Sequence, residues 1–165
     1  FAQHRIERIY WALCYGIPHT TPDRKTGWTR VESLLGRQTT DRKRMTDKPK
    51  VGKKAITDYR AIETFGRHAS WIEAKLHTGR THQVRVHLTS QQLSILGDPV
   101  YGTPGPTQPK WKALPTLVRE AVEALPGQAL HAHVLGFSHP ITGQELRFEA
   151  PPPEAFARVL ATLKR

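Results

Sequence analysis

Two alternating segments separated by a glycine constrain the fold more than any other feature of this chain. Residues 55–65 and 69–76 each have the period-two pattern and the branched and aromatic residues of a strand, and Gly66 between them is a turn residue. In the second segment Ile72, Ala74 and Leu76 fall on one face, and the residues between them fall on the other. The pattern predicts two strands joined by a tight turn.

Further elements surround this pair. Aromatic and branched residues at 8–17, ending before Pro18, predict another strand, and residues 145–148 predict a later one. Apolar residues at helical spacing predict one helix over 114–125 and a final helix over 156–163. Because strands and helices follow one another without βαβ regularity, we expect an α+β domain with a mostly antiparallel sheet, in which 103–127 is a loop and helix insertion.

Length and composition favour one globular domain over residues 1–165. The chain is 38% apolar and 24% charged, which is ordinary for a folded protein. Its single cysteine, Cys14, excludes an internal disulfide framework and fits a reducing compartment. No apolar run is long enough to span a bilayer. We therefore expect a cytoplasmic protein without a membrane partner, and we expect it to be a monomer.

Positive charge is concentrated in the first third of the chain. The formal net charge is +11, and residues 1–60 carry +8 of it (14 Lys and Arg minus 6 Asp and Glu). Its densest part is a basic loop, residues 37–54, which suits a nucleic-acid backbone because each phosphate that is neutralised releases counterions. A solvated loop without a partner is the alternative. The candidate phosphate contacts are Arg37, Arg42, Lys43, Arg44, Lys53 and Lys54.

The segment that follows the two central strands carries the most distinctive motifs. Residues 79–87 read GRTHQVRVH, and residues 97–102 read GDPVYG. Within the first motif the alternating valines at 84 and 86 fit a strand, whereas Thr81 could cap a helix that runs through Leu88. The pattern alone leaves both structures open.

These two motifs together resemble the signature of the RluA-type pseudouridine synthases, which isomerise uridine in structured RNA. Other segments resemble family motifs in the expected order and extend the resemblance over nearly the whole chain. They are residues 7–13, 36–45, 52–57, 128–132, 137–143 and 148–151. The resemblance implies the pseudouridine synthase fold, a mixed sheet divided by an RNA-binding cleft, with this chain as the second half of the catalytic domain. It also implies a short helix after a sharp turn at Gly79.

The resemblance assigns catalytic roles to two residues. Tyr10 would stack on the flipped uracil and act as the base that removes a proton, whereas its pattern alone favours a core tyrosine in a strand. Arg80 would pair with a nucleophilic aspartate and hold it ionised; the alternative is an arginine that anchors a turn. The expected contacts to RNA and to the flipped base near Arg80 are Thr81, His82, Gln83 and Arg85.

The family's nucleophilic aspartate motif is absent from these 165 residues, so we expect the chain to be a fragment that is inactive alone. The resemblance implies RNA as the partner, with large-subunit ribosomal RNA as the substrate, and no cofactor. The alternative is a non-catalytic RNA-binding or ribosome-assembly module. We expect no metal site. His77, His82 and His87 recur in steps of five, and at this spacing they do not share one face of a helix or of a strand.

Overall fold

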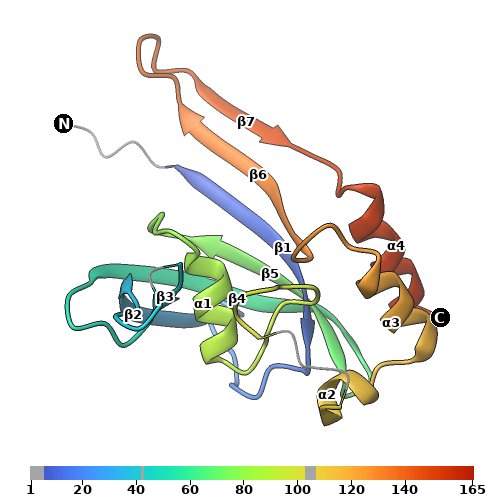
Figure 1. The fold of residues 1–165 in the computed structure, drawn as a ribbon. Coiled ribbons are helices and arrows are strands. Elements are labelled where there is room, and N and C mark those ends of the chain that lie inside the picture. The colour runs from blue at the N-terminus through green and yellow to red at the C-terminus, as the bar shows by residue number, and fades with distance from the viewer. Residues whose placement is uncertain (1–5, 42, 103–106) are drawn as a thin grey trace.

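The computed structural model describes residues 6–41, 43–102 and 107–165 (Figure 1). Its strands are β1 Glu7–Tyr15, β2 Thr29–Arg37, β3 Met45–Thr46, β4 Lys53–Phe65, β5 Ala69–Leu76, β6 Leu130–Ser138 and β7 Glu145–Glu149. Its helices are α1 Gln83–Ser90, α2 Pro109–Lys112, α3 Thr116–Glu123 and α4 Glu154–Leu163. The described residues therefore form the α+β domain that the sequence predicts.

All these strands belong to one sheet. Within the described residues the sheet has seven strands in the order β3-β2-β4-β5-β1-β6-β7, and every neighbouring pair is antiparallel. Strand β1 therefore lies between β5 and β6, which are far from it in sequence. Figure 1 shows α1 in front of the β4–β5 part of the sheet, while α3 and α4 lie together at another end.

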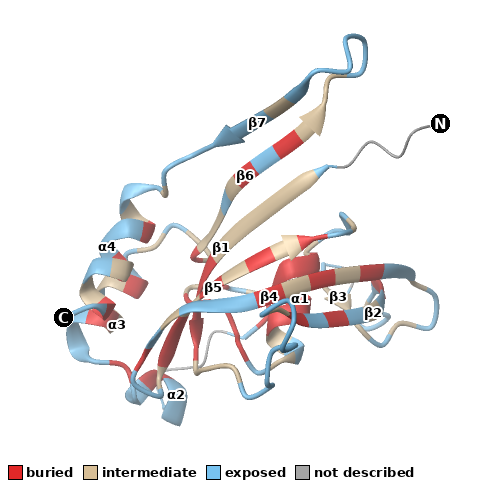
Figure 2. Cartoon of the chain, turned by 180° about the vertical axis from the view of Figure 1, so that it is seen from behind, coloured by how far each residue is buried: buried red, intermediate tan, exposed pale blue. Residues whose placement is uncertain are grey.

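The β4–β5 hairpin confirms the prediction from alternation. Gly66 turns the chain with φ of +56°, a conformation that residues with a Cβ rarely adopt. Along β5 the side chains of Ile72, Ala74 and Leu76 are buried, and those between them are partly exposed. Figure 2 shows that burial is concentrated where β1 and β5 meet the helices, whereas β7 is mostly exposed.

Three strands, β2, β3 and β6, were not predicted. In β2 Thr29, Val31 and Leu35 are buried at alternating positions, but Thr29 and Ser33 are polar and Gly36 is buried out of step, so the apolar sequence signal is weak. Strand β6 is interrupted in the same way, because it mixes histidine, alanine and glycine with apolar residues. The predicted basic loop is also shorter than expected: β4 begins at Lys53, and β3 lies inside the loop.

The insertion at 103–127 matches its prediction in part. Residues 103–106 lie outside the described part of the chain. Helix α3 and the final helix α4 confirm the predicted helices, although Leu117 of the predicted apolar stripe is 56% exposed. The short helix α2 lies where only a loop was expected. Among the described residues no helix is long and apolar enough to cross a membrane.

Candidate active site

The signature segment begins with a tight turn between β5 and α1. His82 occupies the N-cap position of α1 with φ of +55°, and no side chain caps the helix there. Thr81 precedes the N-cap residue and is exposed in the turn, so the alternative in which Thr81 caps the helix is wrong. The backbone amide of Gln83 instead donates to the carbonyl of Arg80 at 3.0 Å, which closes the turn locally. The expectation of a short helix after a turn is confirmed.

A pocket of about 290 Å³ lies beside this turn. Tyr10 enters it from β1, and Gln128 lines it from the segment before β6. The signature segment contributes Arg80, His82, Gln83 and Arg85. The structure therefore brings five of the predicted site residues to one pocket, from two regions of the chain that are distant in sequence.

Arg80 lies at the exposed side of this pocket. Its Nε donates to the carbonyl oxygen of Lys54 at 3.1 Å, and its backbone amide donates to Gln83 Oε1 at 3.0 Å. Within the part of the chain that the structure describes, Arg80 forms no ion pair. Its guanidinium is thus exposed rather than buried, and its charge is available to an acidic group that enters the pocket.

Arg85 has a different environment from the one predicted for an RNA contact. Its Nε and Nη2 donate to the two carboxylate oxygens of Asp98 at 2.8 and 2.7 Å, and both side chains are buried. Asp98 also accepts from the backbone amides of Val100 and Tyr101 at 2.9 and 3.1 Å. Because its guanidinium is turned inward, Arg85 does not present a free charge to solvent. The ion pair gives Arg85 a structural role, and its contact with RNA stays a prediction.

These contacts also explain the ionisation of Asp98. Burial opposes its charge, but the hydrogen bonds from Arg85, Val100 and Tyr101 outweigh burial and hold the pKa of Asp98 below its ordinary value. The same ion pair raises the pKa of Arg85. A carboxylate that is engaged in this way is a turn anchor and not a free nucleophile.

His82 is held by Tyr101, a residue that was not predicted to belong to the site. The phenol oxygen of Tyr101 accepts from the backbone amide of Met45 at 2.7 Å and lies 2.8 Å from His82 Nδ1. Burial lowers the pKa of His82, nearby Arg85 lowers it further, and Asp98 opposes this. A neutral imidazole then accepts a hydrogen bond from the Tyr101 hydroxyl at Nδ1 and carries its own hydrogen at Nε2. The position of Tyr101 in the GDPVYG motif was the only sequence signal for it.

Gln83 is buried and fully hydrogen-bonded. Its amide contacts Thr78, Thr57, the Arg80 amide and the Ile56 carbonyl, all at 3.0 Å or less. The polar atoms of the side chain therefore have partners within the protein, and the contact of Gln83 with RNA stays a prediction. Gln83 lines the pocket as part of its wall.

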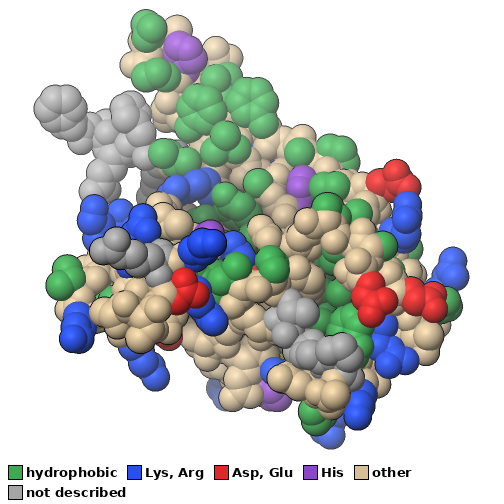
Figure 3. Space-filling model, in the orientation of Figure 1, with side chains coloured by type: hydrophobic (Ala, Val, Ile, Leu, Met, Phe, Trp, Pro, Cys, Tyr) green, Lys and Arg blue, Asp and Glu red, His purple; other side chains and the backbone are tan. Residues whose placement is uncertain are grey.

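The described basic residues of this group lie at the end of β2, in the segment between β2 and β3, and at the start of β4. Figure 3 shows Lys and Arg side chains gathered over that part of the face. Arg37, Lys43, Lys53 and Lys54 are exposed, Lys54 forms an ion pair with Glu32 at 2.6 Å, and the Arg44 guanidinium lies 5.6 Å from the centre of the Tyr101 ring. Arg42 lies outside the described residues.

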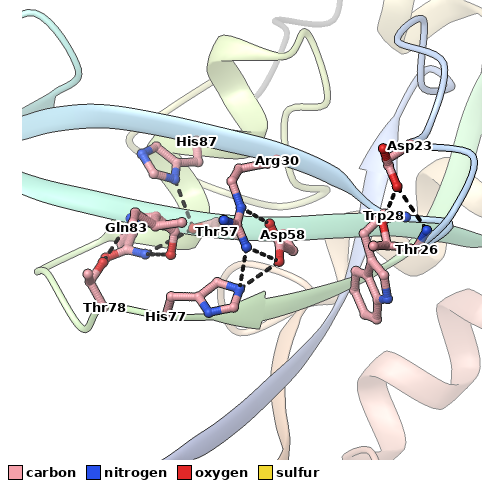
Figure 4. Close-up of polar contacts among 11 residues, drawn as sticks. Asp23, Thr26, Trp28, Arg30, Thr57, Asp58, His77, Thr78, Gln83 and His87 are labelled. Atoms are coloured by element: carbon pink, nitrogen blue, oxygen red, sulfur yellow. Dashed lines mark hydrogen bonds and ion pairs between the residues drawn. The ribbon is translucent and has the colours of Figure 1, made fainter.

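The three histidines in steps of five serve three separate networks. His77 Nε2 lies 2.6 Å from Asp58, which also pairs with Arg30, as Figure 4 shows. His82 contacts Tyr101, and His87 is buried against Thr57. Among the described residues no three His, Cys, Asp or Glu side chains are grouped so that they could hold a metal ion.

Comparison with known proteins agrees with this geometry. Residues 1–90 match the family model described as RNA pseudouridylate synthase, and the chain belongs to this family. It is 40% identical over 168 residues to a protein of Chlorobaculum parvum called "Uncharacterized RNA pseudouridine synthase", a match that covers 99% of this chain and 49% of the relative. It is 38% identical over 167 residues to the "Ribosomal large subunit pseudouridine synthase D" of Vibrio vulnificus, covering 99% of this chain and 46% of that protein.

A solved structure supports the fold. The chain is similar to the structure of "Human RNA Pseudouridylate Synthase Domain Containing 4", with a TM-score of 0.67 and 21% identity. The match covers 96% of this chain and 62% of that one. The chain spans about half the length of the curated relatives it matches.

Proposed function

We propose that the complete protein is an RNA pseudouridine synthase that isomerises uridine to pseudouridine in structured RNA. The observation that carries the proposal is the shared pocket of Tyr10 and Arg80, which come from β1 and from the turn before α1. Membership in the family supports the reaction class. The names of several relatives, including the protein of Vibrio vulnificus, support large-subunit ribosomal RNA as the substrate.

In the proposed reaction Tyr10 stacks on a uracil that has been flipped out of the RNA. A phenol provides both an aromatic face and an oxygen that accepts a proton once it is activated. The bond between C1′ of the ribose and N1 of the uracil breaks, the base turns, and a bond between C1′ and C5 forms. Tyr10 removes the proton from C5 and N1 of the uracil takes up a proton, so that the product has the same atoms as the substrate and no cofactor is needed.

Arg80 orients the nucleophile in this proposal. The nucleophilic aspartate belongs to a segment outside these 165 residues, and Arg80 holds its carboxylate ionised and directed at the sugar. Arg80 is exposed and has no ion pair with a carboxylate of the described chain, which supports this role. Asp98 is a poor candidate for the nucleophile because Arg85 and two backbone amides already engage it.

The RNA backbone is bound by the basic side chains at the end of β2, in the segment between β2 and β3 and at the start of β4, and by Thr81 in the turn. We place the protein in the cytoplasm, acting as a monomer. The proposed phosphate contacts are Arg37, Arg42, Lys43, Arg44, Lys53 and Lys54.

Mapping pseudouridine in RNA tests the proposal. The full-length protein is incubated with unmodified large-subunit ribosomal RNA, and new pseudouridines are located by carbodiimide modification and primer extension. We expect new stops that are absent with Arg80→Ala, and none in transfer RNA or small-subunit RNA. Salt-sensitive RNA binding without any new stop would favour the non-catalytic module instead.

A further inference from the structure

A continuous chain of hydrogen bonds connects the interior of the sheet to the backbone of Arg80. It begins at the hydroxyl of Ser33 in β2, which lies 3.0 Å from His87 Nε2. His87 Nδ1 lies 2.8 Å from the hydroxyl of Thr57, and that oxygen accepts from Gln83 Nε2 at 2.9 Å. Gln83 Oε1 then accepts from the backbone amide of Arg80 at 3.0 Å. Figure 4 shows the central part of this chain beside β4.

A second branch fixes the orientation of the Gln83 amide. Its Nε2 also donates to the carbonyl oxygen of Ile56 at 2.9 Å, and its Oε1 also accepts from the hydroxyl of Thr78 at 2.7 Å. The backbone amide of Ile56 donates to that same Thr78 hydroxyl at 2.9 Å. A carbonyl can only accept and an amide N–H can only donate, so the side-chain amide cannot be reversed without losing bonds at both ends.

The direction of every hydrogen in the chain follows from this orientation. The Thr57 oxygen accepts from Gln83, and among the described residues His87 Nδ1 is the acceptor within reach of its own buried hydrogen, so the hydroxyl donates to Nδ1. His87 is then the neutral tautomer with its hydrogen on Nε2, directed at Ser33. Complete burial of the ring favours the same neutral form and lowers the pKa of His87. Each side chain in this chain of hydrogen bonds therefore determines the hydrogen-bond direction of the next one.

The turn that carries Arg80 depends on this chain for its placement. Thr57 and His87 are fully buried and do not line the pocket, whereas Gln83 does. The backbone amide of Arg80 is held by Gln83. The side chain of Arg80 contacts the Lys54 carbonyl, and this second contact is exposed. We propose that Thr57 and His87 are positioning residues for Arg80: they fix the amide of Gln83, which holds the turn at the mouth of the pocket. This role rests on the function proposed above for Arg80.

The test removes one hydroxyl without changing the shape of its side chain. Thr57→Val in the full-length protein deletes the oxygen between Gln83 and His87, and Thr57→Ser keeps it. Thr29→Val is the matched control, because Thr29 is also buried in a strand and lies outside the chain of hydrogen bonds. Two readouts are measured: turnover of uridine in large-subunit RNA, and hydrogen–deuterium exchange of the peptide over residues 77–82.

We expect Thr57→Val to lower kcat about 10-fold to 100-fold, the scale of a small misplacement of a catalytic group, with KM for RNA unchanged within about twofold. Exchange over residues 77–82 should accelerate in the same variant. Thr57→Ser should restore both properties, and Thr29→Val should alter neither. The role is overturned if Thr57→Val behaves like Thr29→Val, or if exchange accelerates while kcat stays at the wild-type value. If the wild-type protein has no turnover, the proposed function fails, and exchange alone decides whether Thr57 holds the turn.

Discussion

The guanidinium of Arg85 and the carboxylate of Asp98 meet through two hydrogen bonds of 2.8 and 2.7 Å in the interior of the domain. This pair joins α1 to the GDPVYG turn. The same carboxylate holds the backbone amide of Tyr101, whose phenol contacts His82 at the pocket. A buried ion pair thus links the two signature motifs, and through Tyr101 it helps to hold His82 in the pocket wall.

Replacing Asp98 with Asn should destabilise the fold. The variant keeps the shape of the side chain but leaves the buried Arg85 charge unpaired and places an NH₂ group against an N–H donor. Breaking a buried pair in this way costs about 3 kcal/mol or more of unfolding free energy. Urea denaturation of the two proteins measures it. Glu154→Gln, which breaks an exposed pair with Arg158, is the control and should have little effect. Equal stability of Asp98→Asn and wild type would contradict the structural role.

The buried His87 should make the protein less stable in mild acid. Burial lowers its pKa from the ordinary 6.5, so the unfolded chain takes up a proton at a higher pH than the folded one. The contribution of neutral His87 to the free energy of unfolding is therefore fully present above about pH 6.5, and it is lost as the pH falls towards the pKa of His87 in the folded protein. Denaturation at pH 7.5 and pH 5.5 should show this loss in the wild type and a smaller loss in His87→Asn. The same pH dependence in both proteins would exclude His87 as its source.

Reversing charge in the basic segment should weaken RNA binding and its dependence on salt. Lys43→Glu and Lys53→Glu each remove the positive partner of a proposed phosphate, and the slope of log K against log salt should fall by about 0.7 to 0.9 for each phosphate that is no longer neutralised. Arg158→Glu makes the same charge change on α4, outside the basic segment, and should leave the slope unchanged. Filter binding over a salt series gives these slopes. Similar slopes for all three variants would assign the effect to net charge alone.

The sequence predicted the parts of the fold that depend on local pattern. The β4–β5 hairpin follows from alternation around Gly66, and α4 follows from helical spacing after a run of prolines. Strands β2 and β6 were missed because their alternation is short and mixed. Segment β2 forms a strand by pairing with β4, and segment β6 does so by pairing with β1. Pairing between distant segments is a tertiary effect that local propensity does not contain.

The residues of the candidate site were likewise predicted only in part. The family motifs identified Tyr10 and Arg80, which do line one pocket. They did not show that Gln83 and Arg85, which were predicted to contact RNA, are buried and hydrogen-bonded within the domain. Their actual partners, such as Thr57 and Asp98, are distant in sequence, and only the folded chain brings these donors and acceptors together.

Tritium release from RNA labelled at C5 of uridine measures whether Tyr10 and Arg80 act on one uridine in one pocket. The full-length protein should release tritium from large-subunit RNA, and Tyr10→Phe and Arg80→Ala should each be slower by at least about 100-fold while they still bind the RNA. Release at the wild-type rate by either variant, or none by the wild type, would contradict the claim.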